Sequence, residues 1–372
     1  MSRRQWFFRV ALLAACAALA GPIPSPRAAP APLTRKQKVE VVFVIDTTGS
    51  MGGWIEMCKL KFWALCYSFT NTRPAPELKV GLVDYRDKGD MWITKVYDLR
   101  DDLDAVFADL QTFRADGGGD TPEHVNQALF DAVHKVKWST DRNTLRLIYL
   151  IGDAPAHMDY TDDVKYPVTC KEAMKRGIII NAIQCGTDND CTKHWRDIST
   201  LAGGAFFQLP NSGAIRALTA PQDRRLQEIN NELMRSIIVW GPSAKRDADL
   251  SKMRGSTNLA EAAAADRLGI MIRENRVAHY DLLDSMRMGR VKLESLKADE
   301  LPADMQKLNM KERREHIEKV VIRRGALIKE ALDLDKKRSA HLASILSRGT
   351  DNFDGPLLDM LRRQAKKFRL KY

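Results

Sequence analysis

The strongest constraint on the fold is a series of apolar runs separated by segments with helical spacing. The runs are VEVVFVI (39–45), LKVGLVDY (78–85), LRLIYLIGD (145–153) and IIINAIQCG (178–186). Continuous apolar runs of this length are typical of strands buried on both faces. Strands that alternate with helices predict an α/β fold with a doubly wound, mainly parallel sheet.

Two further strands and several helices complete this pattern. MWITKVYDL (91–99) follows a short loop with Gly89 and predicts a hairpin with the strand before it, and AFFQL (205–209) predicts a last strand. In TPEHVNQALFDAVHKV, Thr121 is placed as a helix cap and Pro122 in the first turn. We therefore expect the sheet and its helices to occupy residues 38–240.

The composition changes after Pro221, where strand patterns stop. Residues 223–238 predict one helix, and the segments 256–300 and 304–347 have the pattern of long, charged helices divided at Leu301-Pro302. These segments lack a sustained heptad, so they indicate a small all-α bundle over residues 241–372. The same boundary predicts that residues 36–241 fold alone.

The N-terminus has the pattern of an export signal over residues 1–20, with a basic start, an apolar run and an A-L-A site. The apolar run is too short to span a bilayer, which takes about 20 residues. Ser2-Arg3-Arg4 is similar to a twin-arginine signal, whereas the segment before Cys16 is similar to a lipoprotein box; a plain secretory signal is the third alternative. Residues 21–37 are Pro/Ala-rich and predict a spacer. We expect a periplasmic, cell-envelope or secreted protein that touches a membrane only if Cys16 is lipidated.

The remaining five cysteines are expected to be core residues or to form a disulfide, and not to bind a metal. Cys58 and Cys66 are eight residues apart on one expected helix, about 12 Å along its axis, so they should be core residues and not a disulfide. Export permits a disulfide among the other three, and Cys185–Cys191 is the first choice over pairs with Cys170. No CxxC motif occurs, so a structural zinc site is not expected.

Oxygen-bearing side chains follow the expected strands. Asp46 ends the first, with Thr48 and Ser50 just after it, and Asp153 ends LRLIYLIG. A glycine-rich loop, Gly117–Asp120, opens a helix at the same predicted edge. Because ligands of open α/β sheets bind outside the carboxyl ends of the strands, these loops should converge. Carboxylates and hydroxyls suit a hard cation such as Mg²⁺ or Mn²⁺.

At these residues the chain resembles the von Willebrand factor type A domain. That family carries a metal-ion-dependent adhesion site, with a D-x-S-x-S loop, a threonine from a second loop and an aspartate from a third. Here Asp46, Thr48, Ser50 and Asp153 match, with Thr48 in place of the first serine, and Ala154 departs from a common glycine. In the second loop, Asp120 and Thr121 stay open as alternatives. The match is greatest to a bacterial branch with DTTGSM and GGGD-x-PE loops.

Other polar residues have structural explanations. Thr121 is a good helix N-cap whether or not it binds a cation. The DYRD segment (84–87) predicts a solvated loop, although it lies where it would face the same edge. His124, His157 and His194 form no motif, so we expect them at the surface or at helix ends.

The resemblance implies a module that binds proteins, and we expect no enzymatic activity because no nucleophile or base is evident beside the site. Its divalent cation would complete its coordination with an Asp or Glu of a protein partner. The alternatives are a metal-dependent hydrolase or phosphatase and a structural protein with a vestigial site. DTTGS differs from the DTGS of aspartic proteases by one threonine, and no G-x-S-x-G or H-E-x-x-H occurs. The net charge of +11 could attract nucleic acid, but the export signal and the lack of a reader motif argue against it.

Overall fold

The structure is a computed structural model that describes residues 36–72, 75–210, 217–348, 354–368 and 370. The predicted export signal and nearly all of the predicted spacer lie outside these residues, so both stay predictions. In the described part, we find no helix that is both long and apolar enough to cross a bilayer.

Six strands form one sheet in the order β3-β2-β1-β4-β5-β6. β1 pairs in parallel with β2 and β4, and β5 and β6 continue the parallel series. β3 is antiparallel to β2, which confirms the predicted hairpin. The doubly wound, mainly parallel sheet is thus confirmed, and β1 lies at its centre. The strands are β1 (Lys38–Asp46), β2 (Glu77–Tyr85), β3 (Thr94–Arg100), β4 (Thr144–Gly152), β5 (Ile178–Cys185) and β6 (Gly203–Leu209).

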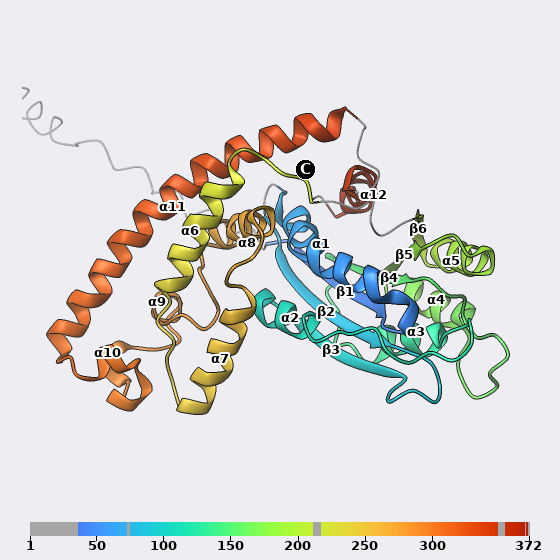
Figure 1. The fold of residues 1–372 in the computed structure, drawn as a ribbon, viewed down its shortest axis with the longest axis horizontal. Helices are drawn as coiled ribbons and strands as arrows, with labels where there is room; N and C mark the ends of the chain where they lie inside the picture. Colours follow the sequence, from blue (N-terminus) through green and yellow to red (C-terminus); the bar gives the residue numbers. More distant parts are fainter. Residues whose placement is uncertain (1–35, 73–74, 211–216, 349–353, 369, 371–372) are drawn as a thin grey trace, which may run out of the picture. The chain divides into compact units, whose positions relative to one another are not determined.

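Both faces of the sheet are covered by helices, because successive residues of a strand point to opposite sides. Val41 and Phe43 of β1 belong to an apolar cluster with α1 and α2, whereas Val42 and Val44 belong to a second cluster with α3, α4 and α5. Figure 1 labels these elements. Their bounds are α1 (Gly52–Thr70), α2 (Leu103–Leu110), α3 (Val125–His134), α4 (Tyr166–Lys175) and α5 (Asn189–Leu201).

The region after residue 222 is helical, as predicted, but its helices are shorter than expected. A long helix over 256–300 is wrong: Asn258 and Asn275 adopt φ of 62° and 52°, and Asn275 ends α8 in the left-handed conformation. Among the helices described after residue 222, α11 alone is long, with 38 residues. The helices are α6 (Asp223–Arg235), α7 (Ser243–Gly255), α8 (Glu261–Glu274), α9 (Leu282–Arg287), α10 (Ala303–Gln306), α11 (Met310–Ser347) and α12 (Asp354–Lys366).

The apolar core continues across the predicted boundary at residue 240. Ala264 and Ile270 of α8 and Met360 of α12 belong to the same buried cluster as Phe43 of β1. Residues 36–372 form one compact unit. The boundary therefore marks a change of composition inside a shared core, and independent folding of residues 36–241 stays a prediction.

Buried ion pairs also join the helical region. Arg267 of α8 is 1% exposed, and its guanidinium contacts both carboxylate oxygens of Asp104 on α2, at 2.7 and 2.8 Å. Burial would oppose the charge of each group, and the paired charge outweighs this cost, so the pKa of Asp104 lies below its usual value. Within the helical region, buried arginines also pair with carboxylates: Arg324 with Asp281, and Arg338 with Asp223 and Asp266.

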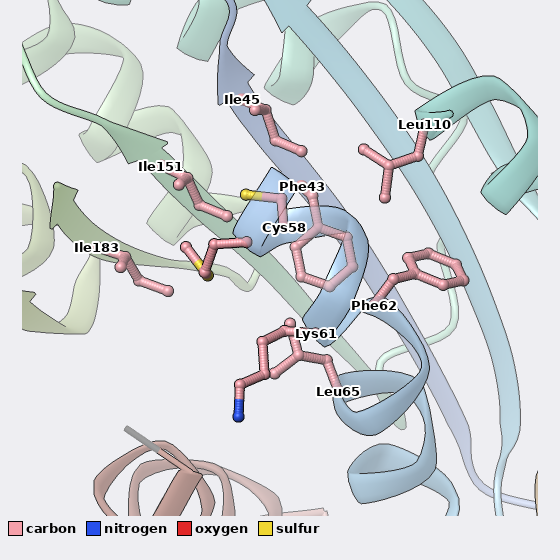
Figure 2. Close-up of a pocket in the computed structure, with 10 residues that line it drawn as sticks. Phe43, Ile45, Cys58, Lys61, Phe62, Leu65, Leu110, Ile151 and Ile183 are labelled. Carbon is pink, nitrogen blue, oxygen red and sulfur yellow. The ribbon is translucent and has the colours of Figure 1, made fainter. Parts of the chain in front are cut away.

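An apolar cavity lies between α1 and the sheet (Figure 2). Phe43, Phe62 and Ile151 are among the side chains that line it, and Lys61 is its one charged lining residue among those described. Figure 2 shows the Lys61 ammonium directed away from the apolar side chains. That ammonium pairs with Asp354 of α12. The cavity therefore belongs to the packing of α1 and α2 on the sheet.

The cysteines are free in the described part of the chain, and each is buried. Cys58 and Cys66 are core residues of α1, as expected. The Cys185–Cys191 disulfide is wrong, because Cys185 packs in the cluster under α1 and Cys191 packs in the cluster on the other face of the sheet.

Candidate metal centre

Asp46 occupies the carboxyl end of the central strand. β1 neighbours β2 on one side and β4 on the other, so this end lies where the order of the strands reverses. The Asp46 side chain is fully buried. Its Oδ1 accepts hydrogen bonds from the backbone N–H of Thr48 at 2.9 Å and from the Thr48 hydroxyl at 2.7 Å. Its Oδ2 is buried and has no hydrogen-bond partner among the described residues.

A second carboxylate approaches from the neighbouring strand. Asp153 follows β4, and its Oδ1 accepts a hydrogen bond from the Ser50 hydroxyl at 3.0 Å. Gly152 permits the approach, because a Cβ there would lie 3.0 Å from the Cβ of Asp46 and 2.6 Å from the Tyr85 hydroxyl. The structure thus brings together four of the predicted residues, which we call the rim cluster: Asp46, Thr48, Ser50 and Asp153.

Glu123 is a site residue that sequence reasoning did not assign. It is 3% exposed, and a Cβ on Gly118 would lie 3.4 Å from its Oε1 and 3.5 Å from the Thr48 Cβ, so the glutamate side chain adjoins the rim cluster. Its Oε2 is buried with no hydrogen-bond partner in the described part of the chain. The available signal was the glutamate of the GGGD-x-PE loop, but nothing in the sequence indicated that it would be buried.

Burial and like charge disfavour ionisation throughout this group. Desolvation raises the pKa of Asp46 to about 7, hydrogen bonds from Thr48 oppose that rise, and repulsion from Asp153 adds to it. Desolvation and then repulsion from Asp46 raise the pKa of Glu123 to about 9. Desolvation also raises the pKa of Asp153. The Tyr85 hydroxyl is close enough to lower the pKa of Asp46 a little, although the two groups lack hydrogen-bond geometry.

Asp120 and Thr121, the two alternatives from the second loop, have no contact with the rim cluster among those found in the described residues. The Asp120 side chain is 67% exposed, and its Oδ1 is 3.5 Å from Nε2 of His157. Thr121 is exposed and does not cap a helix, because α3 begins at Val125. The chain before α3 is extended instead, held by a parallel bridge between Glu123 and Ala156. Whether Asp120 or Thr121 ligates a cation stays a prediction.

The DYRD segment is buried, so the expected solvated loop is wrong. Asp84 is 3% exposed and accepts a hydrogen bond from the Thr47 hydroxyl. Arg86 donates to the backbone oxygen of Arg114 at 3.1 Å and lies 4.0 Å over the Trp92 ring. These contacts fasten the β2–β3 connection to the loop before Gly117.

The histidine prediction is also wrong in part. His124 and His157 are 2% and 3% exposed, and both pack against Tyr160. His194 is less buried, and its Nδ1 accepts a hydrogen bond from the backbone N–H of Ala156 at 3.1 Å. His124 and His157 are thus buried beside Tyr160, whereas His194 lies on α5 and holds the loop after β4 through Ala156.

A comparison with protein families finds a match over the part of the chain that forms the sheet and the rim cluster. Residues 40–211 match the von Willebrand factor A domain family. The match spans the sheet and the rim cluster and ends before the helical region. It supports the resemblance described above, whereas the bacterial branch with its DTTGSM loop stays a prediction.

Individual relatives are distant. A putative ariadne-like RING finger protein of Acanthamoeba polyphaga mimivirus is 24% identical over 234 residues, which cover 58% of this chain and 23% of the viral protein. Proximal thread matrix protein 1 from the mussel byssus is 15% identical, with a TM-score of 0.38, over 48% of this chain and 43% of that one. Its form with a zinc-occupied MIDAS motif is 16% identical, with the same TM-score, over 46% and 42%. At this level of similarity, neither mussel structure assigns a ligand to this chain.

Proposed function

We propose that this protein is a metal-dependent binding module, not an enzyme, and that the rim cluster holds Mg²⁺ or Mn²⁺. The observation that carries the proposal is the buried Oδ2 of Asp46, which has no hydrogen-bond partner in the described residues and faces a group of further carboxylates. Burying an ionised carboxylate without a partner is costly. A divalent cation would remove that cost.

The donor set fits a hard cation. Asp46 and Asp153 supply carboxylate oxygens, Thr48 and Ser50 supply hydroxyls, and Glu123 adds an acid beside them. Mg²⁺ prefers oxygen ligands and keeps several waters. Thr48 is 1% exposed whereas Ser50 is exposed, so the cluster is closed on the side of the sheet and open on the side of Ser50.

The open side suggests how a partner would bind. A water on the cation could be replaced by a carboxylate of an Asp or Glu on another protein, which adds a direct charge contact. The family match over residues 40–211 supports this use of the site. An exported location at the cell envelope would suit such a module and remains part of the proposal.

Calorimetric titration of the chelator-treated protein with Mg²⁺ and Mn²⁺ tests the site. We expect one ion to bind wild type and none to bind Asp46→Asn. Asp333→Asn, an exposed carboxylate on α11, is the matched control and should bind like wild type. Equal binding by wild type and Asp46→Asn would refute the site.

Peptide arrays test the partner chemistry. Peptides with Glu or Asp should bind only when Mg²⁺ is present, and EDTA or Ser50→Ala should weaken that binding. Matched Gln and Asn peptides are the control. Peptide binding that ignores EDTA and the acid-to-amide change would show that the rim cluster does not capture partners.

A further inference from the structure

A second group of possible ligands lies beside the rim cluster and shares none of its four residues. Nε2 of His157 is 3.5 Å from a carboxylate oxygen of Asp87 and 3.5 Å from one of Asp120. The three ligand atoms lie within 4.8 Å of one another. We call this group the histidine cluster. Its members come from three separate loops, those that follow β2, precede α3 and follow β4.

Nε2 of His157 lies toward the carboxylates of Asp87 and Asp120 but makes no hydrogen bond to either of them. The His157 side chain is 4% exposed, and its Nε2 has no hydrogen-bond partner within the described part of the chain. An N–H···O hydrogen bond has its heavy atoms about 2.9–3.0 Å apart, so 3.5 Å is too long. Oδ1 of Asp87 is likewise buried and unpartnered there. A buried imidazole nitrogen and a buried carboxylate oxygen thus lack the partners that their environment demands.

The surrounding contacts orient both groups. Nδ1 of His157 is 2.7 Å from Oδ1 of Asp159, so a neutral imidazole would carry its proton on Nδ1 and turn the Nε2 lone pair toward Asp87 and Asp120. The Tyr160 ring stacks on the imidazole with centroids 4.0 Å apart, and its hydroxyl donates to Oδ2 of Asp87 at 2.8 Å. Metal-bound histidines commonly donate their other N–H to a carboxylate in this way.

The spacing and charge of the three ligands indicate the kind of ion. Bonds of about 2.0–2.1 Å in a tetrahedral site put ligand atoms about 3.4 Å apart, close to the 3.5 Å separations found here. Two carboxylates with a neutral imidazole carry a charge of −2, which a divalent ion balances. Imidazole favours zinc-type ions, whereas Mg²⁺ prefers oxygen alone.

We propose that His157, Asp87 and Asp120 bind a Zn²⁺ ion, separate from the cation of the rim cluster. The ion would connect the three loops next to Glu123. It would thereby fix the positions of these loops beside the rim cluster. This inference uses none of the four rim-cluster residues, and it assigns Asp120, one of the two second-loop alternatives, to the zinc ion.

The test uses the full chain with the rim cluster disabled. Chelator-treated Asp46→Asn protein is titrated with Zn²⁺ by calorimetry, and with Co²⁺ by absorption spectroscopy, in excess Mg²⁺. We expect one Zn²⁺ per chain and a Co²⁺ spectrum typical of four-coordination. Adding His157→Gln should weaken Zn²⁺ binding by at least about a hundredfold, and Asp159→Asn by about 10–100-fold.

Control variants keep the result decisive. His341→Gln changes an exposed histidine on α11 and should leave the titration unchanged. If His157→Gln does not fold, Asp120→Asn decides instead, because that side chain is exposed and its loss should not disturb packing. The proposal is overturned if Asp46→Asn protein binds no Zn²⁺, or if both ligand variants bind Zn²⁺ as well as their parent. Either result would leave His157 as a buried ion-pair residue only.

Discussion

Replacing Asp46 by asparagine should stabilise the protein when metal is absent, although it destroys the proposed site. Asparagine has the shape of protonated aspartate and keeps an oxygen for the Thr48 hydrogen bonds. The folded-state pKa of Asp46 is raised from 3.8 to about 7. At a pH above both values, the ionised side chain therefore costs about 4 kcal/mol of folding free energy, taking 1.36 kcal/mol per pKa unit. Desolvation supplies most of this cost, and repulsion from Asp153 is already included in it.

The sign follows from proton binding. Between pH 4 and 7 the folded state holds more protons at Asp46 than the unfolded state does, so stability falls as pH rises through this range. The variant lacks this loss. We take the difference in unfolding free energy between the variant and wild type, and use its value below pH 4 as the reference. This difference should grow in favour of the variant by about 2 kcal/mol at pH 5 and by about 4 kcal/mol at pH 8. Urea unfolding in EDTA at a series of pH values measures this difference.

Added Mg²⁺ should reverse the order of stability. The cation binds the ionised carboxylates of the folded state only, so wild type gains stability as pH rises and the asparagine variant does not respond. Two results would refute the reasoning. One is a wild-type-to-variant difference that stays constant from pH 4 to 8 in EDTA, and the other is an equal response of both proteins to Mg²⁺.

Three other predictions concern the rest of the chain. Asp104→Ala leaves Arg267 buried without its partner and should lower the unfolding free energy by about 3–5 kcal/mol in urea, whereas Asp109→Ala, which breaks a partly exposed pair, should cost about 1 kcal/mol or less. Residues 36–241 alone should bind a hydrophobic dye and melt below the full chain, because they lack the part of the core that α8 and α12 supply; melting at the same temperature would contradict the shared core. Intact-mass measurement on protein from its native host should show the loss of residues 1–20, or of 1–15 if Cys16 is lipidated, and a full-length mass would contradict both.

The sheet and most of the rim cluster could be predicted because they follow local rules. Apolar runs identify strands, and parallel strands bring their carboxyl ends to one edge. Asp46 and Asp153 therefore had to lie near each other once their strands were recognised as neighbours. The hydroxyls of Thr48 and Ser50 followed from their distance along the chain from Asp46.

The loops could not be predicted, because their burial depends on contacts between distant segments. Glu123 is buried by the bridge to Ala156, and His157 is buried by stacking on Tyr160. Neither contact has a periodic signal in the sequence. The helix predicted after Thr121 forms, but it begins at Val125 and not next to Thr121, since pairing with the loop after β4 holds the preceding segment extended.

The buried arginines fix the position of α11 within the helical region and the position of α8 against α2. Sliding α11 by one turn would move Arg324 and Arg338 about 5.4 Å from their carboxylates, and moving α8 would do the same to Arg267. Each displaced guanidinium would be left in the interior without a counter-charge, at about 3–5 kcal/mol. Intermediate positions are therefore too costly to populate. α11 therefore has one register against α6 and α8, and α8 has one register against α2.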